Sequence, residues 1–267
     1  MKEFNKGRVL ILPDWHQDLK FLHACLELNF DYVVFLGDDF DTFKEPDGVN
    51  ISGFTQTCDT VNWLFDKYKD IGCFLAGNHN LAYFATYNKD YIKTRPNEDY
   101  LCSGWTKKKA TTFNKVINPA VMEGTELCCK VGDYIVSHAG FHWNHFNPMR
   151  SEIDNIKNLY NHWEQTKMEF SRFPGHWIWD VGQCRGGHHS IGSPVWLDWH
   201  FEFQPLDGVK QIVGHTTRLV DYIRCKKNHL GLENYIVDNM QSACMIWEDG
   251  KTIFLNPFTN KELEIEQ

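Results

Sequence analysis

The sequence predicts an α/β protein: a two-sheet sandwich flanked by helices, with an inserted cap. Three observations support this fold class. Strand-like and helix-like segments alternate over the first 80 residues, further apolar strands recur after residue 130, and a stretch rich in tryptophan and histidine interrupts them. No linker or repeat divides the chain, so we expect residues 1–267 to form one domain with the cap at about residues 141–206.

The first half of the chain carries an alternating pattern of buried strands and amphipathic helices. The expected elements are a strand at 8–12, a helix at about 19–28, a strand at 32–36, a helix at about 55–68 and a strand at 72–76. The strands are continuous apolar runs, which is typical of strands buried on both faces. Strands joined through helices predict a parallel sheet with right-handed crossovers.

The second half continues with strands at 133–137 and 209–213. Three further apolar runs, at 234–238, 243–247 and 252–255, are expected to form a closing antiparallel meander. The segment Glu248-Asp-Gly-Lys is typical of a hairpin turn. Within the cap, one helix is expected near Glu152 to Phe170.

Composition excludes several classes of protein. The chain has 27 basic and 35 acidic residues, a net charge of -8, which disfavours a coat for nucleic acid or an anionic membrane. No run of about 18 apolar residues predicts a membrane span, and the polar segment Met1–Gly7 does not resemble a signal peptide. Nine cysteines without CxxC spacing indicate reduced thiols, so we expect a cytoplasmic protein.

Metal-ligand residue types follow several of the predicted strands. These residues are Asp14 and His16, Asp38 and Asp41, Asn78 and His79, then His138 and His215. One such cluster is usually a capping Asp or a surface His. The carboxyl ends of parallel strands meet at one edge of a sheet, so clusters at successive strand ends indicate a shared site.

Six of these side chains form a mixed donor set: Asp14, His16, Asp38, Asn78, His138 and His215. Imidazole and carboxylate together suit Mn, Fe or Zn better than Ca or Mg alone. Six groups are too many for one ion with open positions. They suffice for two ions that share a bridging carboxylate, an arrangement used in phosphate ester chemistry.

Five ordered motifs carry a family resemblance. They are Asp14-x-His16, Gly37-Asp38-x-x-Asp41, Gly77-Asn78-His79, His138-Ala139-Gly140 and Gly214-His215-Thr216. The order resembles that of the calcineurin-like metallophosphoesterases, over residues 9 to about 255. The His-Ala-Gly and Gly-His-Thr variants look most like the phosphoprotein phosphatase branch, which includes bacterial and phage serine/threonine phosphatases and symmetrical diadenosine tetraphosphatases. The resemblance implies the metallophosphoesterase form of the two-sheet sandwich.

The resemblance also implies a role for each ligand. Asp14 and His16 would hold the first metal, Asp38 would bridge both, and the second metal would take Asn78, His138 and His215. The cofactors would be two divalent ions. Mn²⁺ is the ion expected, and Fe, Zn, Ni and Mg are alternatives. A hydroxide bridging the two ions would attack phosphorus.

His79 would act as the general acid, and Asp41 would hold it. An imidazole that carries a proton near neutral pH needs a carboxylate to keep it charged and oriented. The chain also departs from the family pattern. Thr42 follows Asp41 where that branch has an arginine.

Other departures concern phosphate binding. Asp198 stands where a second arginine is usual, and Thr217 replaces a ligand histidine of related nucleases. We expect Arg185 or Arg218 to bind phosphate in place of the usual arginines, with an exposed arginine as the alternative for each. His142 is expected either to contact substrate or to pack within the cap.

The expected activity is that of a metallophosphoesterase acting on a phosphoprotein or a nucleotide. Alternatives are a dinucleoside polyphosphate hydrolase, a nucleic-acid phosphatase or phosphodiesterase, and a catalytically weak phosphate-binding module. The net charge disfavours long nucleic acid, and no membrane partner is expected. The cap tryptophans are expected to pack together, or to stack on a nucleobase. Lys107–Lys109 and Lys226–Lys227 are expected to be solvated.

Overall fold

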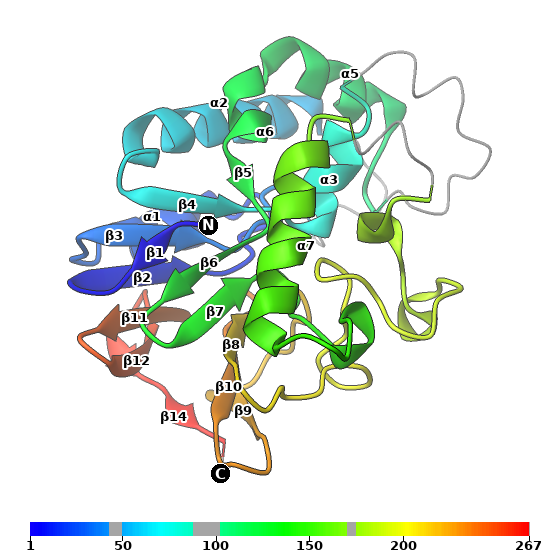
Figure 1. Ribbon diagram of the computed structural model, residues 1–267. Helices are drawn as coiled ribbons and strands as arrows, with labels where there is room; N and C mark the ends of the chain where they lie inside the picture. Colours follow the sequence, from blue (N-terminus) through cyan, green and yellow to red (C-terminus); the bar gives the residue numbers. More distant parts are fainter. Residues whose placement is uncertain (43–49, 88–101, 170–174, 267) are drawn as a thin grey trace.

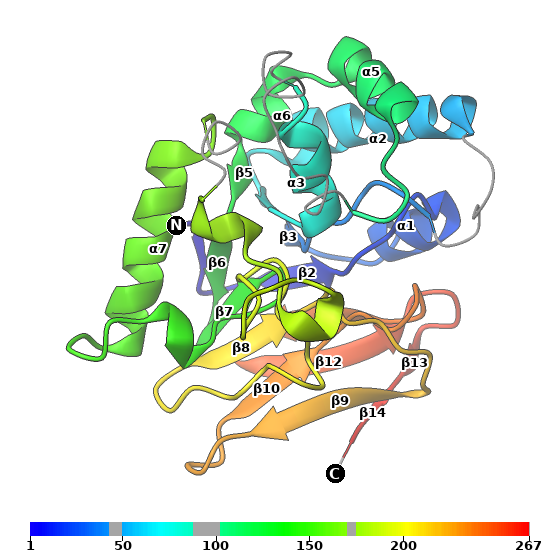
Figure 2. The same cartoon turned by 90° about the vertical axis from the view of Figure 1, so that its right-hand side faces the viewer.

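Two β-sheets pack face to face at the centre of the computed structural model, which describes residues 1–42, 50–87, 102–169 and 175–266 (Figures 1 and 2). The strand order is β13-β12-β11-β2-β3-β4-β5 in one sheet and β1-β6-β7-β8-β10-β9-β14 in the other. The predicted two-sheet sandwich with flanking helices is therefore confirmed.

The first sheet comprises β2 (Arg8–Leu12), β3 (Tyr32–Phe35), β4 (Gly72–Leu75), β5 (Thr125–Glu126), β11 (Cys244–Glu248), β12 (Lys251–Asn256) and β13 (Lys261–Glu262). Strands β2 to β5 are parallel, whereas β11 pairs with β2 in the antiparallel sense. Side chains alternate across β2. Val9 and Ile11 pack between the sheets, while Leu10 and Leu12 pack beneath the helices.

The second sheet comprises β1 (Glu3–Phe4), β6 (Cys128–Val131), β7 (Tyr134–Ser137), β8 (Lys210–Val213), β9 (Tyr222–Lys227), β10 (Glu233–Ile236) and β14 (Glu264–Ile265). Strands β7, β8 and β10 are parallel neighbours. Each sheet thus contributes a block of parallel strands, and the carboxyl ends of these blocks carry the predicted ligands.

The helices cover the outer faces and one end of the sandwich (Figure 1). They are α1 (Leu19–Leu26), α2 (Ile51–Tyr68), α3 (Asn78–Phe84), α5 (Lys107–Val116), α6 (Pro119–Glu123), α7 (Glu152–Thr166) and the 3-10 helices η1 (Trp143–His145), η3 (Trp177–Trp179) and η4 (Gln183–Arg185). The Asn50 side chain accepts a hydrogen bond from the Gly53 amide and caps α2. This cap explains why α2 begins four residues before the predicted start.

The predicted closing meander is wrong. Strand β10 belongs to the second sheet, where it pairs with β8 and β9, while β11 and β12 form a hairpin in the first sheet. The polar strand β9 carries no apolar run, so the sequence analysis missed the partner of β10. The hairpin turn is confirmed, with Asp249 and Gly250 both at positive φ, as tight hairpins require.

The segment predicted to form the cap, residues 141–206, contains α7 and three 3-10 helices within its described part. Helix α7 ends at Thr166, and Phe170, the predicted end, lies outside the described residues. Beyond residue 175 the segment lies at the carboxyl ends of β7 and β8 (Figure 2), where the Ala139 amide donates to the Pro194 carbonyl. Among the described residues, no helix combines the length and apolarity needed to cross a bilayer.

Candidate metal centre and catalytic acid

The six predicted ligands meet where the two sheets present their strand ends. Asp14 and His16 follow β2, Asp38 follows β3, and Asn78 begins α3 directly after β4. From the other sheet, His138 follows β7 and His215 follows β8. The structure therefore brings together residues that lie up to 201 positions apart in the chain, and the His215 amide donates to Asp14 Oδ2 over 3.0 Å.

One group of ligand atoms surrounds Nε2 of His138. This atom lies 3.0 Å from Oδ1 of Asn78, 3.3 Å from Nδ1 of His215 and 3.4 Å from Oδ2 of Asp38. Asp38, His138 and His215 satisfy the spacing of a metal site, with ligand atoms within 4.8 Å of one another. These are the residues assigned to the second metal.

A second group lies around His16. Its Nε2 atom is 4.0 Å from Oδ2 of Asp38, and His16, Asp38 and His79 also place possible ligand atoms within 4.8 Å of one another. Oδ2 of Asp38 thus faces both groups, while its Oδ1 accepts the amide of His79 over 2.8 Å. This geometry suits a bridging carboxylate. Asp14 lies beside the centre, with Oδ1 3.9 Å from Nδ1 of His138.

Hydrogen bonds behind the ligands orient them toward the centre. Nδ1 of His138 lies 2.8 Å from the Leu36 carbonyl, and Nδ1 of His16 lies 3.2 Å from the Phe40 carbonyl. A proton on each Nδ1 leaves Nε2 as the ligand atom. The side-chain nitrogen of Asn78 donates to Sγ of Cys102 over 3.2 Å. This hydrogen bond directs the amide oxygen of Asn78 toward Nε2 of His138.

Unpartnered buried atoms show that the residues fit cations. Oδ1 of Asp14 and Nε2 of His215 are buried and make no hydrogen bond within the described residues. Such atoms are costly unless a ligand satisfies them. Divalent cations, which accept carboxylate, imidazole and amide-oxygen ligands, would satisfy such atoms.

The proton affinities of the metal-free ligands reflect this crowding. Burial and the nearby Asp238 carboxylate raise the pKa of Asp14 well above its usual range. Burial alone would lower the pKa of His138, but Asp38 and Asp14 raise it to about 9. Burial lowers the pKa of His16 to about 4. Burial, His138 and Arg185 hold the pKa of His215 well below its ordinary value.

His79 and Asp41 form a buried pair beside the metal groups. Nδ1 of His79 lies 2.9 Å from Oδ2 of Asp41. Burial would lower the pKa of His79, but the charges of Asp38 and Asp41 and the Asp41 hydrogen bond raise it. The ring also meets His16 edge-on at 5.1 Å between centroids. A protonated imidazole next to a metal group is suited to donate a proton to a leaving group.

Asp41 has two further partners that the sequence analysis missed. The Tyr83 hydroxyl and Nζ of Lys109 donate to Oδ1 of Asp41, over 2.6 and 2.9 Å. Lys109 is buried, so the expectation of a solvated Lys107–Lys109 run is wrong at this position. Lys226 is half-buried and donates to the carbonyls of Trp199 and Phe203, so only Lys227 of that pair is solvated.

Backbone conformation shapes the loops that carry the ligands. His16, Asp38, Asp41 and His215 all have positive φ, an unfavourable conformation that costs about 1–3 kcal/mol for each residue. Close approach also restricts Gly77, because a Cβ there would lie 2.3 Å from Oδ1 of Asp38. The sequence therefore accepts local strain in order to aim these side chains.

The three predicted substrate-binding residues occupy different settings. Arg185 lies near His215, since its charge lowers the pKa of that residue. Its Nη2 donates to the Thr216 hydroxyl over 2.9 Å, and Nε lies 2.9 Å from Oδ2 of Asp198. Arg218 is exposed, and its charge acts on His200 and Arg224. His142 is buried against Trp143 and accepts the Asn144 amide.

The cap tryptophans do not form a single cluster. Trp163, Trp179 and Trp199 are buried, whereas Trp143 is 60% exposed. Trp199 stacks on Phe203, with 4.5 Å between ring centroids. Trp196 is half-buried and meets the ring of His215, a predicted metal ligand, edge-on at 5.8 Å between centroids.

Comparison with known proteins adds a family and a fold. The model of the calcineurin-like phosphoesterase family matches residues 7–218. No match was found among curated proteins. The solved structure of a cold-active protein-tyrosine phosphatase from the psychrophile Shewanella sp. is similar, with a TM-score of 0.57 and 13% identity, over 99% of this chain and 82% of that one.

Two further solved structures are similar. Another structure of a cold-active protein tyrosine phosphatase gives a TM-score of 0.60 and 12% identity, over 98% of this chain and 80% of that one. A metallophosphoesterase from Sphaerobacter thermophilus gives a TM-score of 0.46 and 14% identity, over 98% of this chain and 90% of that one. At these identities, the likeness to the tyrosine phosphatases concerns the fold.

Proposed function

The chain belongs to the calcineurin-like phosphoesterase family, whose members hydrolyse phosphoric esters, and we propose that it is a phosphomonoesterase that uses two divalent cations, with His79 as the acid. The convergence of ligand atoms on Nε2 of His138 and Oδ2 of Asp38, next to the buried His79–Asp41 pair, carries the proposal. The residues proposed to bind the metals therefore lie beside the residue proposed to donate the proton.

The first cation would be held by Asp14, His16 and Asp38. The second would be held by Asp38 together with Asn78, His138 and His215. When bound, the cations neutralise phosphate charge and make water a nucleophile near neutral pH. Mn²⁺ is the ion proposed for both positions, because mixed imidazole and carboxylate donors suit it.

The chain's own residues complete the reaction. The oxygen of a water molecule forms a bond to phosphorus and the water releases one proton to solvent, while the bond from phosphorus to the ester oxygen breaks. His79 transfers its ring proton to the departing oxygen, so the alcohol leaves uncharged. Asp41 keeps the imidazole oriented, and Tyr83 and Lys109 keep Asp41 in place.

Arg185 is proposed to bind a non-bridging phosphate oxygen. Asp198, at a position where the resemblance leads us to expect arginine, lies 2.9 Å from its Nε, and the Thr216 hydroxyl accepts from its Nη2. The guanidinium is thus held beside His215, yet the side chain remains 29% exposed. Exposure of this kind leaves room for a phosphate to pair with the arginine. Arg218 acts on His200 and Arg224, and His142 packs against Trp143, so both are weaker candidates.

A phosphoprotein is proposed as the substrate. The net charge of -8 disfavours long nucleic acid, and a protein-tyrosine phosphatase shares the fold. All nine cysteines are free thiols, which supports a proposed location in a reducing compartment such as the cytoplasm.

Hydrolysis of p-nitrophenyl phosphate tests the proposal. The purified protein, loaded with Mn²⁺, should release p-nitrophenol, and EDTA should stop the release. Adding Mn²⁺ back in excess should restore it. A protein that binds Mn²⁺ but hydrolyses neither this ester nor a phosphopeptide would contradict the proposed function.

A further inference from the structure

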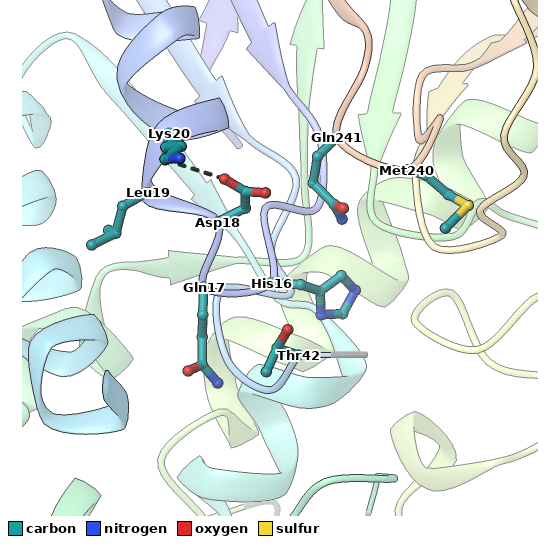
Figure 3. A pocket seen from close by; sticks show the side chains of 8 residues that line it. All are labelled: His16, Gln17, Asp18, Leu19, Lys20, Thr42, Met240 and Gln241. Atoms are coloured by element: carbon teal, nitrogen blue, oxygen red, sulfur yellow. Dashed lines mark hydrogen bonds between the residues drawn. The ribbon is translucent and has the colours of Figure 1, made fainter. Parts of the chain in front are cut away.

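A cavity of about 530 Å³ lies next to the group of possible ligand atoms around His16. Its walls are His16, Gln17, Asp18, Leu19, Lys20, Thr42, Met240 and Gln241, and we call it the His16 pocket. Figure 3 shows the His16 imidazole between the Gln241 amide above and Thr42 below. The volume falls in the range that holds a small organic molecule, about 300–1,000 Å³.

Two residues of the pocket wall connect it to the proposed acid, His79. The His16 ring, which forms part of its wall, meets the His79 ring edge-on at 5.1 Å. Thr42, on another wall, directly follows Asp41, the carboxylate that binds His79. A leaving group that takes its proton from His79 would therefore have this pocket nearby.

The chemistry of the walls selects against a second phosphate. Leu19 and Met240 offer apolar surface, while Gln17, Gln241 and Thr42 are polar side chains without charge. The Asp18 carboxylate accepts the amides of Lys20 and Phe21 at the start of α1. Lys20, an exposed residue, supplies the single cationic side chain of the described lining besides histidine. Phosphate recognition ordinarily uses several cationic or amide donors together.

We propose that the His16 pocket is the leaving-group subsite and that it binds an uncharged organic group, such as the ring of a phenol. This inference rests on the proposed phosphomonoesterase function. It makes the substrate a phosphomonoester of a neutral alcohol or phenol, such as a phosphorylated tyrosine side chain. A dinucleoside polyphosphate would place a second phosphate in the pocket, and a nucleic-acid diester would place a charged chain there.

Phosphonates test the subsite by binding alone, because they are not hydrolysed. Calorimetric titration of the Mn²⁺-loaded protein would compare methylphosphonate, benzylphosphonate and 4-carboxybenzylphosphonate. Benzylphosphonate should bind about tenfold more tightly than methylphosphonate, because its ring fills the pocket. The added carboxylate should weaken binding about tenfold, because the pocket does not compensate its charge.

Substitution of Met240 locates the effect. Met240→Ala should weaken benzylphosphonate binding roughly fivefold through lost apolar contact and leave methylphosphonate unchanged. Met240→Leu should restore most of the affinity. Met149→Ala is the matched control, since Met149 is 89% exposed and lies outside the pocket.

The proposal is overturned if benzylphosphonate and methylphosphonate bind equally, or if the carboxylated ring binds as tightly as the plain one. Equal losses for both ligands in Met240→Ala would also overturn it. Hydrolysis of p-nitrophenyl phosphate, measured in parallel, separates the two claims. Ring preference without turnover would retain the pocket as a binding site for an uncharged ring and remove the proposed function, whereas turnover without ring preference would retain the function and remove the subsite.

Discussion

Nζ of Lys109 donates a hydrogen bond of 2.9 Å to Oδ1 of Asp41 in the interior of the protein. The other oxygen of the same carboxylate binds His79. Burial would raise the pKa of Asp41, but the His79 hydrogen bond, with Tyr83 and Lys109, lowers it. The carboxylate therefore stays ionised, and the histidine keeps a fixed orientation.

Removing the lysine should destabilise the fold. Lys109→Met leaves the Asp41 charge buried with one fewer partner, which should lower the free energy of unfolding by about 3 kcal/mol. Urea denaturation followed by circular dichroism measures this change. Lys108→Met is the control, because Lys108 lies on the same helix and is exposed. Equal stability of the two variants would show that the buried pair contributes nothing.

The acid should contribute to turnover without contributing to metal content. His79→Ala should reduce kcat for p-nitrophenyl phosphate by about 10²- to 10⁴-fold, the usual range for a general acid. Elemental analysis should find as much bound metal as in the unmodified protein. His23→Ala, on the exposed face of α1, should have no effect. Unchanged kcat in His79→Ala would remove this assignment.

Bridging by Asp38 predicts joint loss of both metals. Asp38→Asn removes one of the two carboxylates proposed for the first ion and the single carboxylate proposed for the second, and should reduce bound Mn²⁺ to background after dialysis. The neighbouring variant Asp39→Asn should retain metal, since Asp39 accepts from Trp15 and Asn80 instead. Circular dichroism confirms folding of both variants. Retention of one metal ion in Asp38→Asn would assign Asp38 to a single site.

Metal affinity should increase with pH. Without metal, Asp38 and Asp14 outweigh burial and raise the pKa of His138 to about 9, so at pH 7 the ring carries a proton that metal must displace. At pH values below about 9, Mn²⁺ binding should become about tenfold stronger for each unit by which the pH rises. Fluorescence or calorimetric titrations at pH 6, 7 and 8 measure the slope. A flat profile would mean that His138 is not a ligand.

Substrate capture should depend on the Arg185–Asp198 contact. Arg185→Lys loses the planar, two-sided donor and should raise KM about tenfold, with a smaller change in kcat. Asp198→Asn should raise KM by a similar factor, and the double variant should show little additional loss. Arg150→Lys, at an exposed position, serves as the control. Additive effects in the double variant would indicate that the two residues act separately.

Much of the site could be predicted because strand ends in a parallel sheet meet in space whatever the chain connection. This rule placed His16 beside Asp38, which follow the parallel neighbours β2 and β3. His138 follows a strand of the other sheet, so its approach to Asp38 depends on how the two sheets pack, which the rule does not predict. Sheet membership was harder, since the apolar run of β10 suits either sheet and its partner β9 is polar. Lys109 escaped prediction because a run of three lysines does not reveal which of them turns inward.

The contacts that orient the ligands also could not be predicted from the sequence. Cys102 lies 24 positions from Asn78, and only the folded chain brings its sulfur to the amide nitrogen. The His16 pocket is likewise built from three separate segments, around His16, Thr42 and Gln241. No sequence motif predicts such a cavity, because its shape depends on the folded conformation of the connecting loops.

The second proposed cation would join the two sheets of the protein. Asp38 and Asn78 follow strands of one sheet, and His138 and His215 follow strands of the other. An ion held from both sides is a cross-link across the sandwich as well as a reagent, so chelation would loosen the seam between the layers. Heat resistance and catalytic competence would then rise and fall together with metal supply.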